Sequence, residues 1–224
     1  MNEHRSAALR LNSPEMAAIL DLLVPQGVGA TVDDILPGVA SLLERGLVTI
    51  HGETAQLSPQ LVAIIEPIVT RTGSLTVARL TDAQAEEYFV SGERAVRRTS
   101  AEGGSDEFQP MPAKETPAAI AASLRAQAAA ALREPAIPEI GELSRLADIL
   151  GEEDLPKPHS AAGLVLSRPD GDNHIITVLL HDGGFTWVEA EEGKRARVAY
   201  VETEEELAEL VADLIGGGGS PSHP

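Results

Sequence analysis

The sequence contains no cysteine, few aromatic residues and no long apolar run, and each shortage narrows what the chain can do. Without cysteine the chain forms no disulfide framework and carries out no thiol chemistry, which fits a reducing compartment. No apolar run approaches the roughly 20 residues that a membrane-spanning helix needs. The first residues lack the pattern of a signal peptide. We therefore expect a cytoplasmic protein with no membrane-inserted segment.

Cations are also scarce. Lys and Arg number 17 against 35 Asp and Glu, a formal net charge of −18. Most of this imbalance lies in residues 134–224, where 6 Lys and Arg oppose 19 Asp and Glu. Sequence-independent binding to nucleic acid depends on cations that neutralise phosphates, so this region argues against it. Its acids favour a solvated surface or a basic partner.

Motifs of common enzymes are missing as well. The chain has no Gly-x-Ser-x-Gly, no Gly-x-Gly-x-x-Gly, no Walker-type Lys and no His-Glu-x-x-His. Residues 170–173 superficially suggest a cation loop, but the remaining calcium ligands are absent and a hairpin turn explains them better. His174 and His181 would point to opposite faces of one strand. We predict no enzyme activity, no cofactor and no metal site.

The clearest structural signal that is present lies near the C-terminus. Alternation and β-branched residues predict strands over residues 163–168, 174–180, 185–189 and 195–201. Asp-Gly pairs at residues 170–171 and 182–183 separate the first three strands, and this dipeptide strongly favours hairpins. A helix over residues 203–215 follows, with Thr203 as its cap and Glu206 at the capping-box position.

An earlier region has the same order of elements. It has strands predicted over residues 75–80, 88–90, 94–99 and 108–110. Thr116 then caps a helix that extends to Arg133, with Pro117 at its first position. We predict that the two regions are ββββα pseudo-repeats that contribute to one antiparallel sheet.

The N-terminal region is predominantly helical. Residues 1–12 are expected to be frayed, and helices are predicted from Ser13, over residues 31–44, and from Ser58 and Pro59 onward. Two short strands around a tight turn precede the last helix, which is the outline of a winged helix. A recognition helix needs basic side chains, and residues 31–44 contain no Lys or Arg. DNA binding is therefore disfavoured, and a helical cap on a sheet is preferred.

These expectations combine into an α+β fold with a single domain over residues 1–215. Its parts are a winged-helix-like cap, a first pseudo-repeat, a helix with a linker and a second pseudo-repeat, over residues 13–74, 75–133, 134–160 and 161–215. Within the third part, residues 140–150 are predicted to be helical. Residues 216–224 are expected to be a flexible tail.

Three features in this order resemble the EspG family, the cytosolic chaperones of type VII (ESX) secretion in actinobacteria. Residues 42–48 read Leu-Leu-Glu-Arg-Gly-Leu-Val, and after a short turn residues 57–65 read Leu-Ser-Pro-Gln-Leu-Val-Ala-Ile-Ile. The following strand at residues 75–80 and the twofold strand arrangement, each half closed by a helix like that of residues 117–124, complete the resemblance. The chain is short for that family and unusually acidic after residue 134.

The resemblance implies a non-enzymatic protein that covers an exposed apolar tip of a helical secretion substrate, a PE–PPE pair in mycobacteria. Masking such a patch in the cytosol and releasing it at the secretion machinery favours moderate affinity. Three alternatives stay open: an acidic, immunity-like partner-binding protein, a winged-helix transcriptional regulator, and an enzyme without recognised motifs.

Exposed aromatic residues would be the natural contacts for such a partner. Every aromatic residue lies in a predicted strand, and four of them are candidates for partner binding: Tyr88, Phe89, Phe185 and Trp187. Adjacent aromatics on strands are more often core residues. Tyr88 and Phe89 point to opposite faces of their strand, so at least one of them is expected to face away from the main packing.

Overall fold

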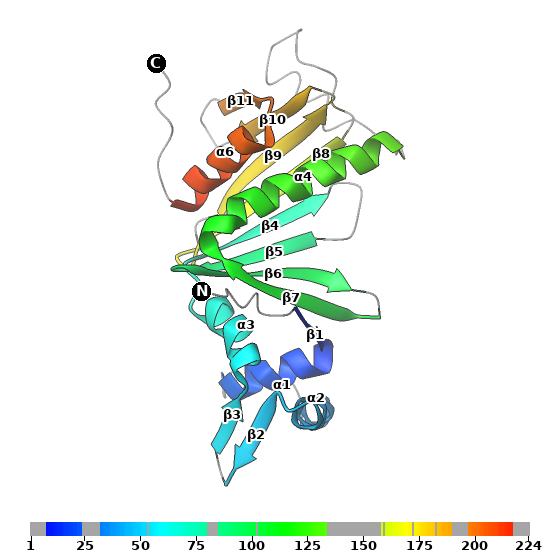
Figure 1. Ribbon diagram of the computed structural model, residues 1–224, viewed down its shortest axis with the longest axis vertical. Coiled ribbons are helices and arrows are strands. Elements are labelled where there is room, and N and C mark those ends of the chain that lie inside the picture. Colours follow the sequence, from blue (N-terminus) through cyan, green and yellow to red (C-terminus); the bar gives the residue numbers. More distant parts are fainter. Residues whose placement is uncertain are drawn as a thin grey trace, which may run out of the picture. The chain divides into compact units, whose positions relative to one another are not determined.

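The computed structural model describes residues 8–23, 32–52, 54–79, 85–101, 103–133, 158, 160–171, 173–181, 183–189 and 197–216 (Figure 1). These residues form five α-helices, nine strands of an antiparallel sheet and a separate two-stranded hairpin. The α+β class and the antiparallel sheet expected from the sequence are confirmed. None of the described helices is long and apolar enough to cross a membrane.

The chain divides into two compact units. Unit 1 comprises residues 1–71 and 89–112, and unit 2 comprises residues 72–88 and 113–224. The predicted cap falls almost wholly in unit 1, whereas the predicted first pseudo-repeat is divided between the units. The single domain over residues 1–215 stays a prediction.

Unit 1 contains the first three helices, the hairpin and one part of the sheet. Its helices are α1 (Ser13–Leu23), α2 (Val32–Glu44) and α3 (Pro59–Val69). Its strands are β1 (Leu9–Asn12), β2 (Val48–His51), β3 (Thr54–Leu57), β6 (Arg94–Ala101), β7 (Ser105–Pro112) and the end of β5 (Ala85–Ser91). Strands β2 and β3 pair with each other, and the sheet strands follow the order β1-β7-β6-β5.

The expected order of helices and strands is present in unit 1, and local chemistry explains where the helices begin. The Ser58 side chain accepts a hydrogen bond from the Leu61 N–H at 3.2 Å and caps α3, with Pro59 at its start. Helix α1 is capped by Asn12, because its Oδ1 accepts from the Glu15 N–H at 2.8 Å. Glu15 Oε2 in turn accepts from the Asn12 N–H at 2.9 Å, which completes a capping box. Membership of the winged-helix class stays a prediction.

The expectation that residues 1–12 are frayed is wrong for Leu9–Asn12. These residues form β1, which pairs antiparallel with β7. Leu9 and Leu11 are buried, and Arg10 forms an ion pair with Glu107 across the strand pair. Burial of two leucines and pairing with a distant strand hold this segment in place.

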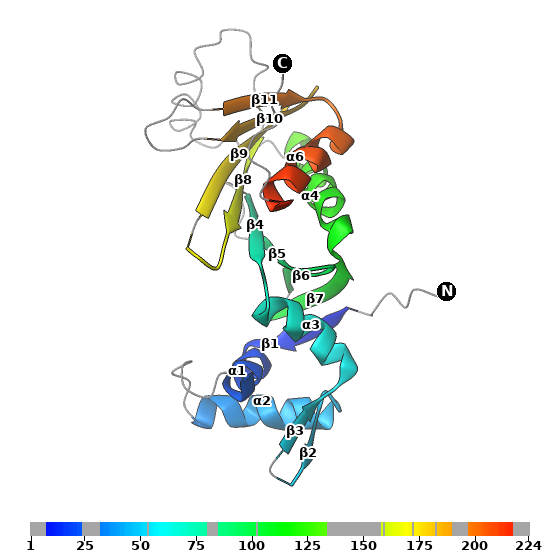
Figure 2. The ribbon, with the colours of Figure 1, turned by 90° about the vertical axis from the view of Figure 1, so that its left-hand side faces the viewer.

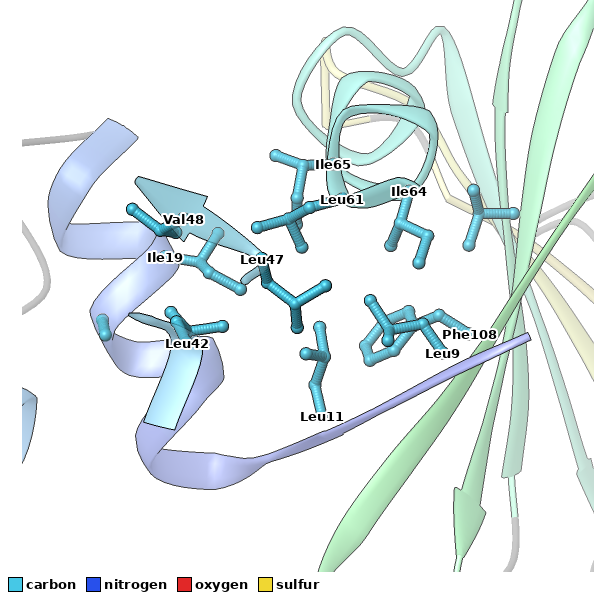
Figure 3. Close-up of a cluster of buried hydrophobic side chains, with 12 residues drawn as sticks. Leu9, Leu11, Ile19, Leu42, Leu47, Val48, Leu61, Ile64, Ile65 and Phe108 are labelled. Atoms are coloured by element: carbon cyan, nitrogen blue, oxygen red, sulfur yellow. The ribbon is translucent and has the colours of Figure 1, made fainter. Parts of the chain in front are cut away.

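The core of unit 1 is a cluster of leucine, isoleucine and valine side chains around Phe108 (Figure 3). Its members come from β1, α1, α2, the turn before β2, β2, α3, β6 and β7: Leu9, Leu11, Ala18, Ile19, Leu42, Leu47, Val48, Leu61, Ile64, Ile65, Val96 and Phe108. Helices α1 and α2 approach so closely that a Cβ at Gly38 would lie 2.0 Å from the Pro14 carbonyl oxygen. Glycine is therefore required at this point of α2, and the close contact supports the cluster.

Unit 2 contains the rest of the sheet and two long helices. Its elements are β4 (Gly73–Arg79), the start of β5, a short 3₁₀ helix (Ala113–Glu115), α4 (Thr116–Arg133), β8 (Ser160–Ser167), β9 (Asn173–His181), β10 (Gly184–Glu189), β11 (Arg197–Val201) and α6 (Glu204–Gly216). The sheet strands follow the order β5-β4-β8-β9-β10-β11. Helices α4 and α6 pack against each other, α4 also contacts β8 and β9, and α6 contacts β11.

The strands of unit 2 correspond closely to the segments predicted from alternation. β8 pairs with β9, and β9 pairs with β10, both antiparallel across the expected Asp-Gly positions. At the second turn the left-handed conformation falls on Gly184, with φ of +147°, and a Cβ there would lie 2.2 Å from the Val201 carbonyl oxygen. Only glycine lets β10 begin this close to β11.

Each set of four strands is followed by a helix, as predicted: β4–β7 by α4 and β8–β11 by α6. The caps of the two helices differ. Thr203 Oγ1 accepts from the Glu206 N–H at 3.2 Å, whereas the buried Thr116 Oγ1 has no hydrogen-bond partner. The cap expected at Thr116 is therefore wrong. The assignment of the two sets as pseudo-repeats stays a prediction. The predicted helix at 140–150, the linker and the tail after residue 216 lie outside the described residues.

Candidate partner-binding surface

The two faces of the sheet in unit 2 are distinguished by strand register. Residues that pair directly across an antiparallel sheet share a face, and alternate residues of a strand belong to opposite faces. One face carries Leu164, Ile176 and Trp187, which are buried, and α4 and α6 lie on one side of these strands (Figure 2). No described helix of unit 2 lies on the opposite side (Figure 2).

The opposite side of strands β4 and β8–β11 is here called the uncharged face. Strand β5 is not part of it, because one of the adjacent residues Glu86 and Glu87 must lie on that side. The described members of the uncharged face are Ser74, Thr76, Ala78, Ala161, Gly163, Val165, Ser167, Asn173, Ile175, Thr177, Leu179, His181, Gly184, Thr186, Val188, Val198 and Tyr200. None of them is Asp, Glu, Lys or Arg, in a chain with 52 such residues.

A solvated sheet face normally carries charged residues, which the uncharged face lacks. Five of its members are already buried within the chain: Ala161, Leu179, His181, Thr186 and Val188. Only the remaining part of the face is open to a partner.

Three large hydrophobic side chains are exposed on the uncharged face. Ile175 is 61% exposed, Tyr200 is 45% exposed and Val198 is 39% exposed. They are the three exposed large hydrophobic residues found in the described part of unit 2, and all lie on this one face. Neighbouring positions carry small or hydroxyl side chains, such as Gly163 and Thr177, which pair across β8 and β9. A Cβ built at Gly163 would meet only the Ala78 carbonyl oxygen, at 3.9 Å.

The Tyr200 ring is held in place by its neighbours. It stacks on His181 with ring centroids 5.2 Å apart and an angle of 9° between the planes. The Tyr200 hydroxyl donates to the Gly183 carbonyl oxygen at 3.1 Å, and His181 Nε2 lies 3.2 Å from Thr186 Oγ1. Because the ring is already ordered, covering it with a partner costs little conformational entropy.

The four aromatic residues predicted to bind a partner are mostly buried and are not among the exposed residues of the uncharged face. Tyr88, Phe185 and Trp187 are buried at 0–4% exposure, and Phe89 is partly exposed. Phe185 and Trp187 share the face that also carries the buried residues Val178 and Leu180. A partner could reach these three only if the unit opened, and partner binding by the four residues stays a prediction.

Sequence reasoning missed the exposed residues of the uncharged face. The signal was present in β9, where residues 174–181 read His-Ile-Ile-Thr-Val-Leu-Leu-His and neither face carries Asp, Glu, Lys or Arg. A strand with one solvated face would alternate apolar and polar residues. The lack of charged residues on either face of β9 was therefore the signal that neither face is fully solvated.

The winged-helix alternative finds little electrostatic support in unit 1. Helix α2, strands β2 and β3 and helix α3 contain no Lys or Arg. Nearby cations are paired with acids: Arg45 with Glu15 and Arg94 with Glu66. In the described residues no group of three or more His, Cys, Asp or Glu is placed to hold a metal ion.

No family model matches the sequence, and no curated protein matches it. Among solved structures, the fold is similar to that of the Mycobacterium tuberculosis type VII secretion system chaperone EspG5, determined in complex with a PE25–PPE41 dimer. The TM-score is 0.53 at 13% sequence identity, over 92% of this chain and 96% of that chain. The resemblance to the EspG family drawn from the sequence is therefore confirmed at the level of fold.

Proposed function

We propose that this protein is a cytoplasmic, non-enzymatic chaperone or adaptor that holds a helical type VII secretion substrate on the uncharged face of unit 2. The observation that carries the proposal is the gathering of Ile175, Val198 and Tyr200 on one face that has no Asp, Glu, Lys or Arg among its described residues. The similarity in fold to a secretion chaperone supports the class of partner.

The chemistry of this face suits an apolar, helical partner surface. No charge has to be desolvated when the face is covered, so apolar burial is not offset by the cost of burying ions. Gly163, which is partly exposed and has no side chain, leaves room for a helix to approach the sheet backbone. The net charge of −18 keeps the free chain dispersed while this apolar face is exposed.

The size of the exposed apolar area suggests moderate affinity. Fully burying a valine, leucine or isoleucine side chain stabilises by about 1.5–3 kcal/mol. The three side chains are already roughly half covered, so completing their burial would contribute roughly 3 kcal/mol in total. Association itself costs more than this, so further contacts on the face must add to it, and the net affinity stays moderate.

The proposal is tested with an affinity-tagged full chain and a matched pair of lysine variants. Tagged protein from its own cells is expected to carry a small helical secretion substrate at near-stoichiometric amounts, identified by mass spectrometry. Ile175→Lys places a charge on the uncharged face and should reduce recovery of this substrate at least about tenfold, because the lysine must be desolvated. Val62→Lys alters an exposed valine on α3 of unit 1 and should leave recovery unchanged.

A second variant tests the same face without adding charge. Gly163→Leu adds a side chain at a position where a Cβ would touch only the Ala78 carbonyl oxygen, at 3.9 Å, so the chain should fold and the partner should be blocked sterically. Retention of the substrate by both Ile175→Lys and Gly163→Leu would contradict the assignment to this face. Recovery of a toxin in place of a secretion substrate would contradict the chaperone role and favour the immunity-like alternative.

A further inference from the structure

Strand β11 forms an edge of the sheet in unit 2. It is the last strand in the order and pairs with β10 alone among the described strands. Edge strands are usually protected by charged residues, proline or a bulge, because their unpaired N–H and C=O groups accept another strand. Residues 197–201 read Arg-Val-Ala-Tyr-Val and contain one charged residue and no proline. Val198 and Tyr200 are exposed beside this edge.

The sequence of β11 is complementary to itself. When two copies of a strand pair antiparallel about a twofold axis perpendicular to the sheet, paired residues must belong to the same face. In β11 only the register centred on Ala199 pairs all five residues. In this register Val198 lies opposite Tyr200 of the second copy, and Tyr200 lies opposite Val198 of the second copy. Aromatic residues paired with β-branched residues are among the favourable cross-strand pairs.

We infer that β11 is a pairing edge for a second copy of this chain, in the antiparallel register centred on Ala199. The single charged residue of the strand, Arg197, lies opposite Val201 of the second copy, so no like charges face each other. Each of the two exposed side chains at the edge gains one partner, and the symmetry produces two Val198–Tyr200 pairs. The inference does not depend on the identity of any other partner.

This pairing extends the uncharged face. A twofold axis perpendicular to the sheet leaves the same face of both copies on the same side. The uncharged face of one copy therefore continues across β11 into that of the second copy. Tyr200 and Val198, which lie at the margin in one copy, become the middle of a face twice as wide.

The expected association is weak and depends on salt. A five-residue strand pair buries far less than the roughly 1,600 Å² of a standard interface. The net charge of −18 on each copy also opposes association, and salt screens this repulsion. Sedimentation of the full chain should therefore show a reversible dimer whose fraction rises with protein concentration and whose association constant rises with salt.

Single cysteines test the register directly, because the chain has no cysteine of its own. Directly opposed residues in an antiparallel pair have Cα atoms about 4.5–5.5 Å apart, within the range of disulfides. Ala199→Cys should therefore cross-link to itself under mild oxidation and give a species of twice the chain mass. Ile175→Cys, two strands away and on the uncharged face, should cross-link at least about tenfold more slowly.

A lysine variant provides an independent readout. Val198→Lys replaces one member of both symmetric Val198–Tyr200 pairs and should lower the association constant about tenfold, while circular dichroism shows that the chain stays folded. Ile175→Lys should associate as the unaltered chain does. A monomer at all concentrations, or faster cross-linking of Ile175→Cys than of Ala199→Cys, would overturn the inference. The second outcome would show that copies associate through their faces and not through the β11 edge.

Discussion

The two faces of the sheet in unit 2 are both apolar, but they are apolar in different ways. Strand β9 contributes to both: Ile176, Val178 and Leu180 are fully buried on the side that carries Phe185 and Trp187. On the other side Ile175 is exposed, whereas Leu179 and His181 are buried. The first face has large side chains that interlock with the helices. The second has β-branched, hydroxyl and small side chains with no charge. Apolar composition alone therefore does not reveal which face is covered by helices and which keeps exposed apolar side chains.

The largest expected effect is a difference in stability between a substitution on the helix-covered face and one on the uncharged face. Phe185→Ala should reduce the free energy of unfolding by about 3–5 kcal/mol, because it leaves a cavity in a fully packed layer. Ile175→Thr replaces one β-branched residue with another at an exposed position, so it should change the free energy of unfolding by less than about 0.5 kcal/mol. Urea unfolding followed by the fluorescence of Trp187, the one tryptophan, measures both. Equal losses would show that the uncharged face is part of the core.

Unit 1 sharpens the contrast, because there a charge is buried and fully paired. Glu15 is 1% exposed, and its carboxylate accepts hydrogen bonds from Ser41 Oγ, Arg45 Nη1 and the Asn12 N–H. Burial by itself would raise the pKa of Glu15. The hydrogen bonds from Ser41, Asn12 and Arg45, together with the charge of Arg45, outweigh burial and hold its pKa below the ordinary value.

Glu15→Gln should therefore destabilise the protein by about 2–4 kcal/mol at neutral pH, since Arg45 loses its anionic partner. Because the pKa of Glu15 is lowered by folding, this stabilisation is present above the ordinary carboxyl pKa and is lost as pH falls through the folded-state pKa. The difference in unfolding free energy between Glu15→Gln and the unaltered chain should shrink accordingly in acid. Urea unfolding monitored by circular dichroism at several pH values measures this. A difference that stays constant below pH 4.5 would contradict the role of the Glu15 charge.

The threonines at the starts of α6 and α4 also differ within unit 2, because Thr203 caps its helix and Thr116 does not. Thr203 and Glu206 form a reciprocal capping box, and Glu206 Oε2 also accepts from the Glu202 N–H at 2.9 Å. Backbone hydrogen bonds from Glu202 and Thr203 lower the pKa of Glu206. Thr203→Ala should cost about 1 kcal/mol in urea unfolding. A loss no larger than that of an exposed alanine substitution elsewhere on α6 would count against the cap.

The smallest effect, with the opposite sign, is expected at Thr116. Its hydroxyl is buried and makes no hydrogen bond. Thr116→Val keeps the shape and removes this unsatisfied group, so it should leave stability unchanged or raise it by up to about 1 kcal/mol. The same urea titration measures the change. Destabilisation by more than about 1 kcal/mol would show that the hydroxyl has a partner in solution.

Local patterns in the sequence predicted most elements because their causes are local. The Asp-Gly pairs, the serine cap before Pro59 and the alternation of β8–β11 each involve residues within a few positions of one another. Leu9–Asn12 was missed because it is four residues long and is stabilised by pairing with β7, almost 100 residues later. No periodic signal reports such a distant partner.

The candidate surface was harder to predict for a different reason. Alternation indicates that Phe185 and Trp187 share a face, but which face the helices cover is a property of the folded unit. Phe185 and Trp187 lie on the face that the helices cover, and both are core residues. The exposed residues Ile175, Val198 and Tyr200 become a group only when the register of β8–β11 brings them onto one face.

The most direct test of the central claim is the reactivity of a single cysteine in the presence and absence of the bound substrate. Ile175→Cys is expected to react readily with a thiol reagent in the free chain and at least about tenfold more slowly in the complex, because a covered side chain excludes the reagent. Val62→Cys on α3 of unit 1 should react at the same rate in both states. Unchanged reactivity of Ile175→Cys in a chain saturated with substrate would contradict the assignment of the uncharged face as the binding surface.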